Sequence, residues 1–260
     1  MDASGLEAAI TPKTKVIMPV SLYGQCADLT AINAVAARYH LPVVEDAAQS
    51  FGATHHGHKS CSLTTIACTS FFPSKPLGCY GDGGACFTQN THLAQRMEEI
   101  RNHGQSKRYI HSRLGINGRL DTLQAAILLE KIQLFPNEIL MRQDVALRYA
   151  ERLPQQLIKP FIEPHHTSVY AQYTIQVPNR EHVQQILQEQ GIPTAVHYPL
   201  GLHRQEAVLQ GAQSEFKYHP YTDYASQVVM SLPMHPYLTE QDQDKICDAV
   251  VAALVEYELA

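Results

Sequence analysis

The chain has 260 residues, of which 45% are hydrophobic, and a formal net charge of −5 with the histidines neutral. This length and apolar content suffice for a sizeable core in one large domain or slightly more. Acidic and basic residues are mixed along the sequence, so we expect neither nucleic acid nor a membrane surface as a partner. No apolar run approaches the ~20 residues that span a bilayer, and we find no signal-peptide pattern. We therefore expect a cytoplasmic protein.

The six cysteines have irregular spacing and form no C-x-x-C pair. In a chain of this size, that pattern is typical of reduced and mostly packed thiols. His55, His56 and His58 are the densest group of the 14 histidines. They lie in a Gly/His/Lys turn with no cysteine or carboxylate at ligand spacing, which favours a plain surface turn over a zinc site. No metal site is expected.

The first half of the chain alternates between strand-like and helix-like segments. Asp28 is placed to cap a helix whose apolar face is formed by Leu29, Ile32, Val35, Ala36 and Tyr39. A second helix is capped by Asn90 or Thr91, runs to about residue 103 and ends at Gly104. Short apolar runs rich in β-branched and aromatic residues predict strands at 16–20, 41–46, 66–72 and 85–88. This order predicts an α/β fold with a mainly parallel sheet covered by helices.

The pattern changes in the second half. The segment 120–135 predicts an amphipathic helix, and a second helix follows to about residue 153, with Pro136 marking a break or kink between them. The face predicted to be apolar in the first of these helices carries Leu120, Leu123, Ile127 and Leu134. Beyond Pro154 we expect an antiparallel strand and two helices, at 170–177, 181–190 and 239–257, and the last helix begins with Thr239 and Asp242 in a capping-box pattern. The predicted domains are therefore a large domain at 1–154 and a small α+β domain at 155–260.

Lys75 lies in an unusual loop just beyond a predicted strand. It stands between two prolines and before several glycines, in the stretch SFFPSKPLGCYGDGG at 70–84. Proline and glycine favour a tight loop whose backbone approaches another group closely. An ordinary surface loop with an exposed lysine is the alternative interpretation.

An acidic residue, Asp46, directly follows the predicted strand at 41–45. Burying a carboxylate there is costly unless it meets a cation or several donors. A pyridinium nitrogen is one such cation, and a carboxylate beside it keeps the ring protonated and electron-withdrawing. A simple helix cap is the alternative. In parallel sheets, ligands bind beyond the carboxyl ends of the strands, and both Asp46 and the 70–75 segment fall at such ends.

These stretches resemble the signature segments of the DegT/StrS-type nucleotide-sugar aminotransferases, which are fold-type I pyridoxal-phosphate enzymes. The blocks EDAAQSFGA at 45–53 and SFFPSKPLG at 70–78 are similar to two family segments. Three further blocks follow in the same order, NGRLDTLQAA at 117–126, GIPT with HYP within 191–199, and LPMHP at 232–236. The resemblance covers essentially the whole chain and implies a large domain with a mainly parallel sheet and a small C-terminal α+β domain.

The resemblance implies a cofactor role for five residues. Lys75 matches the lysine that carries pyridoxal 5′-phosphate and moves a proton in the reaction. Asp46 matches the acid that pairs with the pyridinium nitrogen, and Gln49 matches a residue near the ring oxygen. Ser70 matches a hydroxyl that donates to the phosphate. Asn117 matches a residue that reaches the phosphate from the other subunit, which implies a homodimer with a shared active site.

Three further residues are implied to bind the substrate. Arg119 suits an acidic group because its guanidinium fork matches a carboxylate or phosphate. His197 and Tyr198 match the nucleotide-sugar side of the pocket. A turn residue at Asn117, a solvated charge at Arg119 and a satisfied loop histidine at His197 are the structural alternatives.

The implied reaction moves an amino group from glutamate to the keto group of a sugar linked to a nucleoside diphosphate. The RLDTLQAA form of the segment at 119–126 looks most like members that aminate C3 of a UDP-linked 3-keto-hexuronic acid for O-antigen and other surface polysaccharides. Amination at C4 of a UDP- or dTDP-linked keto sugar is the main alternative. A dehydratase is disfavoured by the lysine at position 75, and a non-catalytic homologue is the remaining alternative.

The chain departs from the family pattern at its start. Family members have an upstream segment with a Gly-Ser/Thr-rich turn that binds the cofactor phosphate through backbone amides. Nothing similar occurs before Lys75 here. We therefore expect the large domain to be incomplete at its N-terminus, and the chain by itself to be weakly active or inactive.

Overall fold

The computed structural model of the chain describes residues 1–211 and 219–258. Its contacts divide the chain into two compact units. Unit 1 comprises Met1–Leu140 with Ile162–Ala171, and unit 2 comprises Met141–Phe161 with Gln172–Ala260. Each unit is described by itself below, and the predicted domain boundary after residue 154 stays a prediction.

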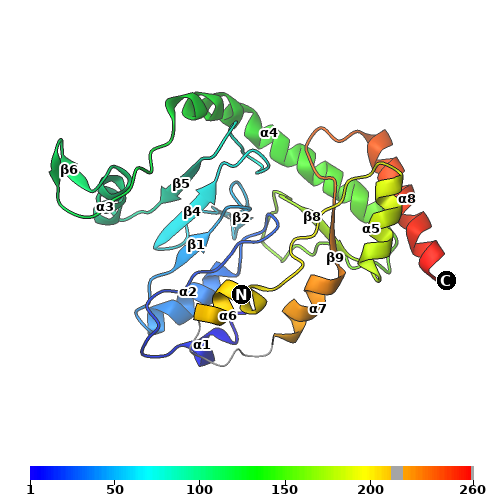
Figure 1. Cartoon of the computed structure of the whole chain (residues 1–260), viewed down its shortest axis with the longest axis horizontal. Helices are drawn as coiled ribbons and strands as arrows, with labels where there is room; N and C mark the ends of the chain where they lie inside the picture. Colours follow the sequence, from blue (N-terminus) through cyan, green and yellow to red (C-terminus); the bar gives the residue numbers. More distant parts are fainter. Residues whose placement is uncertain (212–218, 259–260) are drawn as a thin grey trace. The chain divides into compact units, whose positions relative to one another are not determined.

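The centre of unit 1 is a three-stranded sheet with the order β1-β4-β5 (Figure 1). β1 (Val44–Asp46) pairs in parallel with β4 (Ile66–Ser70), which pairs in antiparallel fashion with β5 (Gly84–Phe87). The predicted strand at 16–20 is present only as two parallel bridges, from Ile17 to Val43 and from Val20 to Asp46. The α/β prediction is confirmed, although the last strand runs against the others.

Two short helices cover one part of this sheet. α1 (Leu6–Ala9) and α2 (Leu29–Arg38) pack around a cluster that includes Ile17, Ile32 and Val43. Asp28 caps α2 as predicted, because its Oδ1 accepts a 3.0 Å hydrogen bond from the backbone N–H of Ala31. Tyr39 was predicted on the apolar face but is 41% exposed, and its hydroxyl donates to Glu7 instead.

Two hairpins and one further helix complete unit 1 before the long helix. α3 (Thr91–Arg101) is capped by Asn90, whose side chain accepts from the N–H groups of His92 and Leu93. The two hairpins were not predicted, because each strand is only two or three residues long. They pair β2 (Thr54–His55) with β3 (His58–Lys59), and β6 (Gln105–Lys107) with β7 (Ile110–His111).

The structure has one helix where two were predicted, so the break at Pro136 is absent and the alternative, a kink, stays a prediction. A single helix, α4, runs from Thr122 to Arg152 and contains Pro136. An internal proline removes one backbone hydrogen bond and costs about 3 kcal/mol in a helix. Apolar burial before and after it opposes that cost, since Phe135 is 5% exposed and Tyr149 is fully buried.

The predicted apolar face of this helix is only partly correct, since Leu120 packs against the core cluster and Ile127 is half-buried. Leu123 and Leu134 are 70% and 57% exposed, whereas Leu128 and Phe135 are buried against Phe71, Leu77 and Cys79. The buried stripe is displaced around the helix from the predicted one. Both stripes have helical spacing, and spacing alone does not tell which one meets the rest of unit 1.

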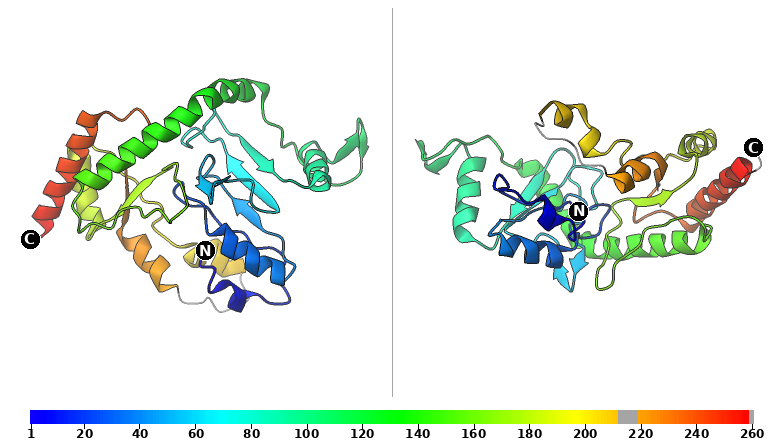
Figure 2. Two further views of the ribbon diagram at one scale, coloured as in Figure 1. Left: turned by 180° about the vertical axis from the view of Figure 1, so that it is seen from behind. Right: turned by 90° about the horizontal axis from the view of Figure 1, so that it is seen from below.

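Unit 2 contains a two-stranded antiparallel sheet of β8 (Tyr173–Gln176) and β9 (Val229–Leu232). The antiparallel strand is as predicted, but its burial does not alternate. α5 (Arg180–Glu189) and α8 (Glu240–Glu258) lie side by side, as Figure 2 shows. Thr239 and Asp242 form the predicted capping pair. The remaining helices are η1 (Leu202–Arg204), α6 (Glu206–Gly211) and α7 (Pro220–Val228).

None of the helices in the described ranges combines the length and apolar character that crossing a membrane requires.

The hairpin of β2 and β3 corrects the prediction of a plain surface turn. His56 and His58 are exposed, but His55 is only 2% exposed. Its Nε2 atom lies 2.7 Å from Thr30 Oγ1 and accepts from the Thr30 backbone N–H at 3.3 Å. Its Nδ1 atom lies 2.5 Å from His166 Nε2. The neutral ring, with its proton on Nδ1, therefore joins α2 to the segment 162–171.

We predict that His55 makes unit 1 less stable as the pH falls. Burial lowers the pKa of His55, the neighbouring His166, His56 and His58 lower it further, and Asp28 opposes them. The unfolded chain therefore binds this proton at a higher pH than the folded chain does. The stabilisation is present above the ordinary histidine pKa of ~6.5 and is lost as the pH falls below it.

The measurement is the free energy of unfolding by denaturant at pH values on either side of the ordinary histidine pKa. His55→Gln should show a smaller decline at acid pH than the unchanged protein. His58→Gln, in the same hairpin but exposed, should retain the full decline. An unaltered decline in His55→Gln would contradict the assignment.

Candidate active site

Asp46 ends β1 and is held in place by its backbone. Its N–H donates to Pro19 O at 2.9 Å, and its carbonyl accepts from Ser21 N–H at 2.9 Å. The side chain is half-buried, and Oδ1 accepts one hydrogen bond, from the N–H of Ala48 at 3.0 Å. Within the described ranges no cation lies against this carboxylate, so it retains acceptor capacity at the strand end.

Gln49 lies in the turn that follows β1 and is 5% exposed. Its Oε1 atom accepts a 2.6 Å hydrogen bond from the backbone N–H of Tyr23. This contact fixes the amide next to the strand end that carries Asp46. The structure therefore brings Asp46 and Gln49 to one edge of the sheet.

Ser70 ends β4, the strand beside β1. In the parallel register Asp46 is opposite Cys68, so Ser70 lies two residues further along its own strand. Ser70 Oγ accepts from the N–H of Phe72 at 3.2 Å. Because the strands are parallel, the carboxyl ends with Asp46 and Ser70 meet at the same edge of the sheet.

Lys75 lies in a loop that is closed by backbone hydrogen bonds to Phe71. Phe71 donates its N–H to Gly83 O at 2.8 Å and accepts from Cys79 N–H at 2.8 Å. The N–H of Lys75 itself bonds to Phe72 O at 2.9 Å, which closes a tight turn. Lys75 is half-buried, and no described residue accepts a hydrogen bond from its ammonium group.

The long helix α4 holds this loop. Gln124 Oε1 accepts from Tyr80 N–H at 2.8 Å, and Lys131 Nζ donates to Gly78 O. A Cβ atom at Gly78 would lie 2.7 Å from the carbonyl oxygens of Phe72 and Pro73. A residue with a Cβ atom would clash with these carbonyl oxygens, so position 78 in the loop after Lys75 requires glycine.

Asn117 and Arg119 lie elsewhere in unit 1, at the end of α3. Asn117 forms a bridge with Asn102, and Arg119 Nη1 lies 3.2 Å from Asn102 Oδ1 and 3.0 Å from His103 Nε2. Both residues are exposed. None of these contacts reaches Asp46 or Lys75.

His197 and Tyr198 belong to unit 2. His197 is half-buried, and its Nδ1 atom lies 2.8 Å from Ser231 Oγ on β9. Tyr198 is 52% exposed, and its ring meets that of His197 edge-on at 5.4 Å.

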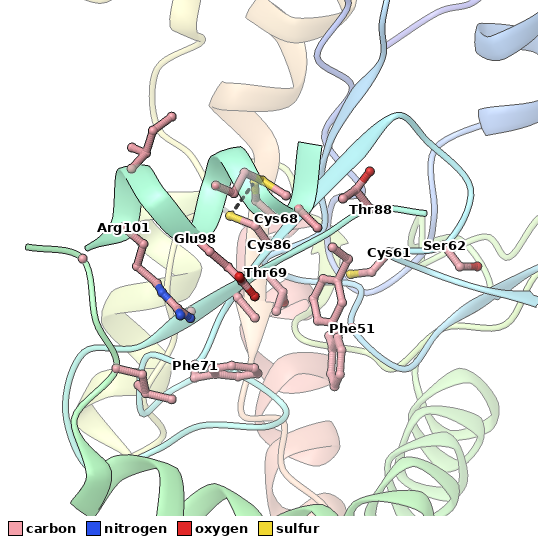
Figure 3. Close-up of a pocket in the computed structure, with 18 of the residues that line it drawn as sticks. Phe51, Cys61, Ser62, Cys68, Thr69, Phe71, Cys86, Thr88, Glu98 and Arg101 are labelled. Carbon is pink, nitrogen blue, oxygen red and sulfur yellow. Dashed lines mark hydrogen bonds between the residues drawn. The ribbon is translucent and has the colours of Figure 1, made fainter. Parts of the chain in front are cut away.

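A groove of about 970 Å³ opens on another part of unit 1 (Figure 3). Its lining includes Phe51, Phe71, Cys68, Cys86 and Arg101. None of the predicted site residues lines it. The groove is therefore distinct from the edge that carries Asp46, and its size does not make it the active site.

No group of three or more histidine, cysteine or acidic side chains in the described ranges could hold a metal ion.

The sequence interpretation missed the residue that supports this site from inside. Glu45 is fully buried, and its carboxylate accepts from Ser21 Oγ at 2.7 Å, Ser60 Oγ at 3.1 Å and Cys61 N–H at 3.0 Å. Two acids in succession on a strand point to opposite faces. That alternation is the signal by which Glu45 could have been found.

Comparison with known proteins identifies the family. A model of the DegT/DnrJ/EryC1/StrS aminotransferase family matches residues 1–251. The chain is 58% identical over 251 residues to the UDP-2-acetamido-2-deoxy-3-oxo-D-glucuronate aminotransferase of Pseudomonas aeruginosa, which covers 96% of this chain and 69% of that protein. The chain belongs to the DegT/DnrJ/EryC1/StrS aminotransferase family.

Solved structures agree with this assignment. A DegT DnrJ EryC1 StrS aminotransferase from Brucella abortus superposes with a TM-score of 0.93 at 38% identity, over 98% of this chain and 70% of that one. NtdA from Bacillus subtilis with bound cofactor PMP gives a TM-score of 0.87 at 30% identity, over 98% of this chain and 60% of that one. The predicted fold-type I class is confirmed.

Proposed function

We propose that the chain carries the chemistry of an aminotransferase that uses pyridoxal 5′-phosphate and acts on a UDP-linked 3-keto-hexuronic acid, aminating C3. The observation that carries this proposal is the pairing of Asp46 and the Lys75 loop at one sheet edge, in a chain 58% identical to a 3-oxo-glucuronate aminotransferase. Glutamate is the proposed amino donor.

The residues at the sheet edge fit this cofactor. A half-buried carboxylate with spare acceptor capacity suits a protonated ring nitrogen, and a lysine amine with no described acceptor suits a carbonyl carbon. Ser70 and Gln49 supply a hydroxyl and an amide at the same edge. When bound, pyridoxal phosphate supplies an electron-withdrawing ring that stores charge from the substrate carbon.

Each side chain then has a stated task. Lys75 binds the cofactor through its amine and moves the proton at the substrate carbon. Asp46 keeps a proton on the ring nitrogen, and Gln49 donates to the ring oxygen. Ser70 donates to the phosphate.

We further propose a homodimer in which Asn117 of one subunit reaches the phosphate of the other. The exposure of Asn117, and its bridge to Asn102 at the end of α3, support this arrangement. So do the exposed apolar residues along α4, since such surfaces are typical of protein interfaces. They include Leu123, Leu129, Ile132 and Leu134. His197 and Tyr198 are proposed for the nucleotide-sugar side, in a cytoplasmic enzyme of surface-polysaccharide synthesis.

We predict a Lys75-dependent visible absorption band when the gene product containing this sequence is mixed with pyridoxal phosphate. Glutamate should bleach the band and appear as 2-oxoglutarate. Lys75→Ala should lack the band and form no 2-oxoglutarate, because it has no amine to bind the carbonyl carbon. Lys59→Ala, an exposed lysine in the β2–β3 hairpin, is the matched control and should retain both.

A band that persists in Lys75→Ala would contradict the role of this lysine. Sugar consumption without 2-oxoglutarate would favour the dehydratase alternative. The amine position in the sugar product, read by NMR, separates C3 from C4 amination.

We predict that Arg119 recognises the uronic carboxylate. Arg119→Gln should lower kcat/KM for the uronic acid substrate by about tenfold or more, since a charge-assisted hydrogen bond contributes roughly 1.5–3 kcal/mol. It should leave kcat/KM unchanged for the matching sugar with a neutral hydroxymethyl group. Arg108→Gln, another exposed arginine, is the control. An equal loss on both sugars would show that Arg119 does not contact the carboxylate.

A further inference from the structure

Two cysteines face each other across the β4–β5 pair. Cys68 and Cys86 are opposite residues in the antiparallel register, and their Sγ atoms lie 3.6 Å apart. Figure 3 shows both thiols at the wall of the groove, joined by a dashed line. Both are free thiols.

Cys68 and Cys86 occupy a non-hydrogen-bonded position of the antiparallel β4–β5 pair, where opposite side chains come closest. In antiparallel pairs, hydrogen-bonded and non-hydrogen-bonded positions alternate. Phe71 N–H bonds to Gly83 O, so that pair is hydrogen-bonded, and the pair three residues back along β4, Cys68 with Cys86, is not. Cα atoms in such a pair are ~4.5 Å apart. This separation is within the range that a disulfide requires.

The two thiols differ in accessibility. Cys86 is exposed, whereas Cys68 is half-buried. Burial, the hydrogen bond to Cys86 and the nearby charges of Cys86 and Asp46 together raise the pKa of Cys68 to about 11. Cys26, Cys61, Cys79 and Cys247 are buried. An oxidant in solution therefore meets Cys86 first, and Cys68 is the thiol next to it.

We propose that Cys68 and Cys86 form a reversible disulfide when a hydroperoxide oxidises the protein. With hydrogen peroxide, the Cys86 thiolate attacks one peroxide oxygen, the O–O bond breaks, and a sulfenic acid and hydroxide form; the hydroxide takes up the proton that the Cys86 thiol released and becomes water. Cys68 Sγ then attacks the Cys86 sulfur, the S–O bond breaks, and the thiol proton leaves with hydroxide as water. Two thiols lose two electrons in total, and hydrogen peroxide is reduced to two waters. A dithiol reductant reverses the reaction by exchange.

This site goes beyond the proposed aminotransferase function and does not depend on it. Neither cysteine belongs to the proposed cofactor or substrate set. Disulfide formation is read by mass and not by activity, so failure of either proposal leaves the other intact.

The test treats the reduced gene product with hydrogen peroxide, blocks remaining thiols with N-ethylmaleimide, digests with chymotrypsin and analyses the peptides by mass spectrometry. Cleavage after Phe71 and Tyr80 separates Cys68, Cys79 and Cys86 onto different peptides. We expect the Cys86 peptide to be linked to the one ending at Phe71, about 2 Da lighter than the two thiol peptides together, and a dithiol to release it.

Variants make the assignment specific. Cys61→Ser should retain the link, which excludes the other cysteine that can share the Phe71 peptide. Cys68→Ser should lose the link and leave Cys86 as a sulfenic acid that dimedone traps, a reaction that also reports that the site is folded and exposed. A link from Cys86 to Cys61 or Cys79, oxidation of Cys86 with Cys68 still alkylated, or no reaction at Cys86 in the unchanged protein would each overturn the proposal.

Discussion

The candidate site depends on the hydrogen bonds that the buried carboxylate of Glu45 accepts. Three donors meet it, from Ser21, Ser60 and the backbone of Cys61. A buried carboxylate without such donors costs several kcal/mol, so the segments that supply them must stay in place for unit 1 to fold. Because neighbouring residues on a strand point to opposite faces, an inward Glu45 turns Asp46 outward. The position of Asp46 is therefore a consequence of core chemistry.

The second half of the site is fixed from outside the sheet. The Lys75 loop is closed on Phe71 and joined to α4 through Gln124 and Lys131. The same helix buries Leu128 and Phe135 against the loop. All of these contacts lie within unit 1. The spatial relation between the carboxylate and lysine therefore rests on one compact body of the protein.

The elements that sequence reasoning placed correctly are those whose signals are local. Helix caps at Asp28, Asn90 and Thr239 are read from two or three neighbouring residues, and the structure has them. The strand end at Asp46 was similarly local, because the apolar run stops there, whereas β4 ends at Ser70, before the predicted end at residue 72. The site residues at these strand ends were identified from sequence motifs that occur in a fixed order, and such motifs indicate chemistry more specifically than helix or strand propensity does.

The errors arose where distant segments decide the outcome. Two stripes of α4 have helical spacing, and the loop after Phe71 selects Leu128 and Phe135 over Leu123 and Leu134. His55 reads as a surface residue among histidines and glycine, yet Thr30 and His166, far away in sequence, enclose it. The donors to Glu45 come from two separate segments, one at Ser21 and one at Ser60 and Cys61. Contacts with residues that are distant in the sequence cannot be inferred from the few residues around each position.

The central claim is that the strand bearing Glu45 presents Asp46 to the nitrogen of the cofactor ring. The most direct test is the nitrogen-15 NMR spectrum of the gene product loaded with ring-labelled pyridoxal phosphate. The account predicts a protonated ring nitrogen in the unchanged protein at neutral pH and a deprotonated one in Asp46→Asn. The same nitrogen shift in both proteins would contradict it.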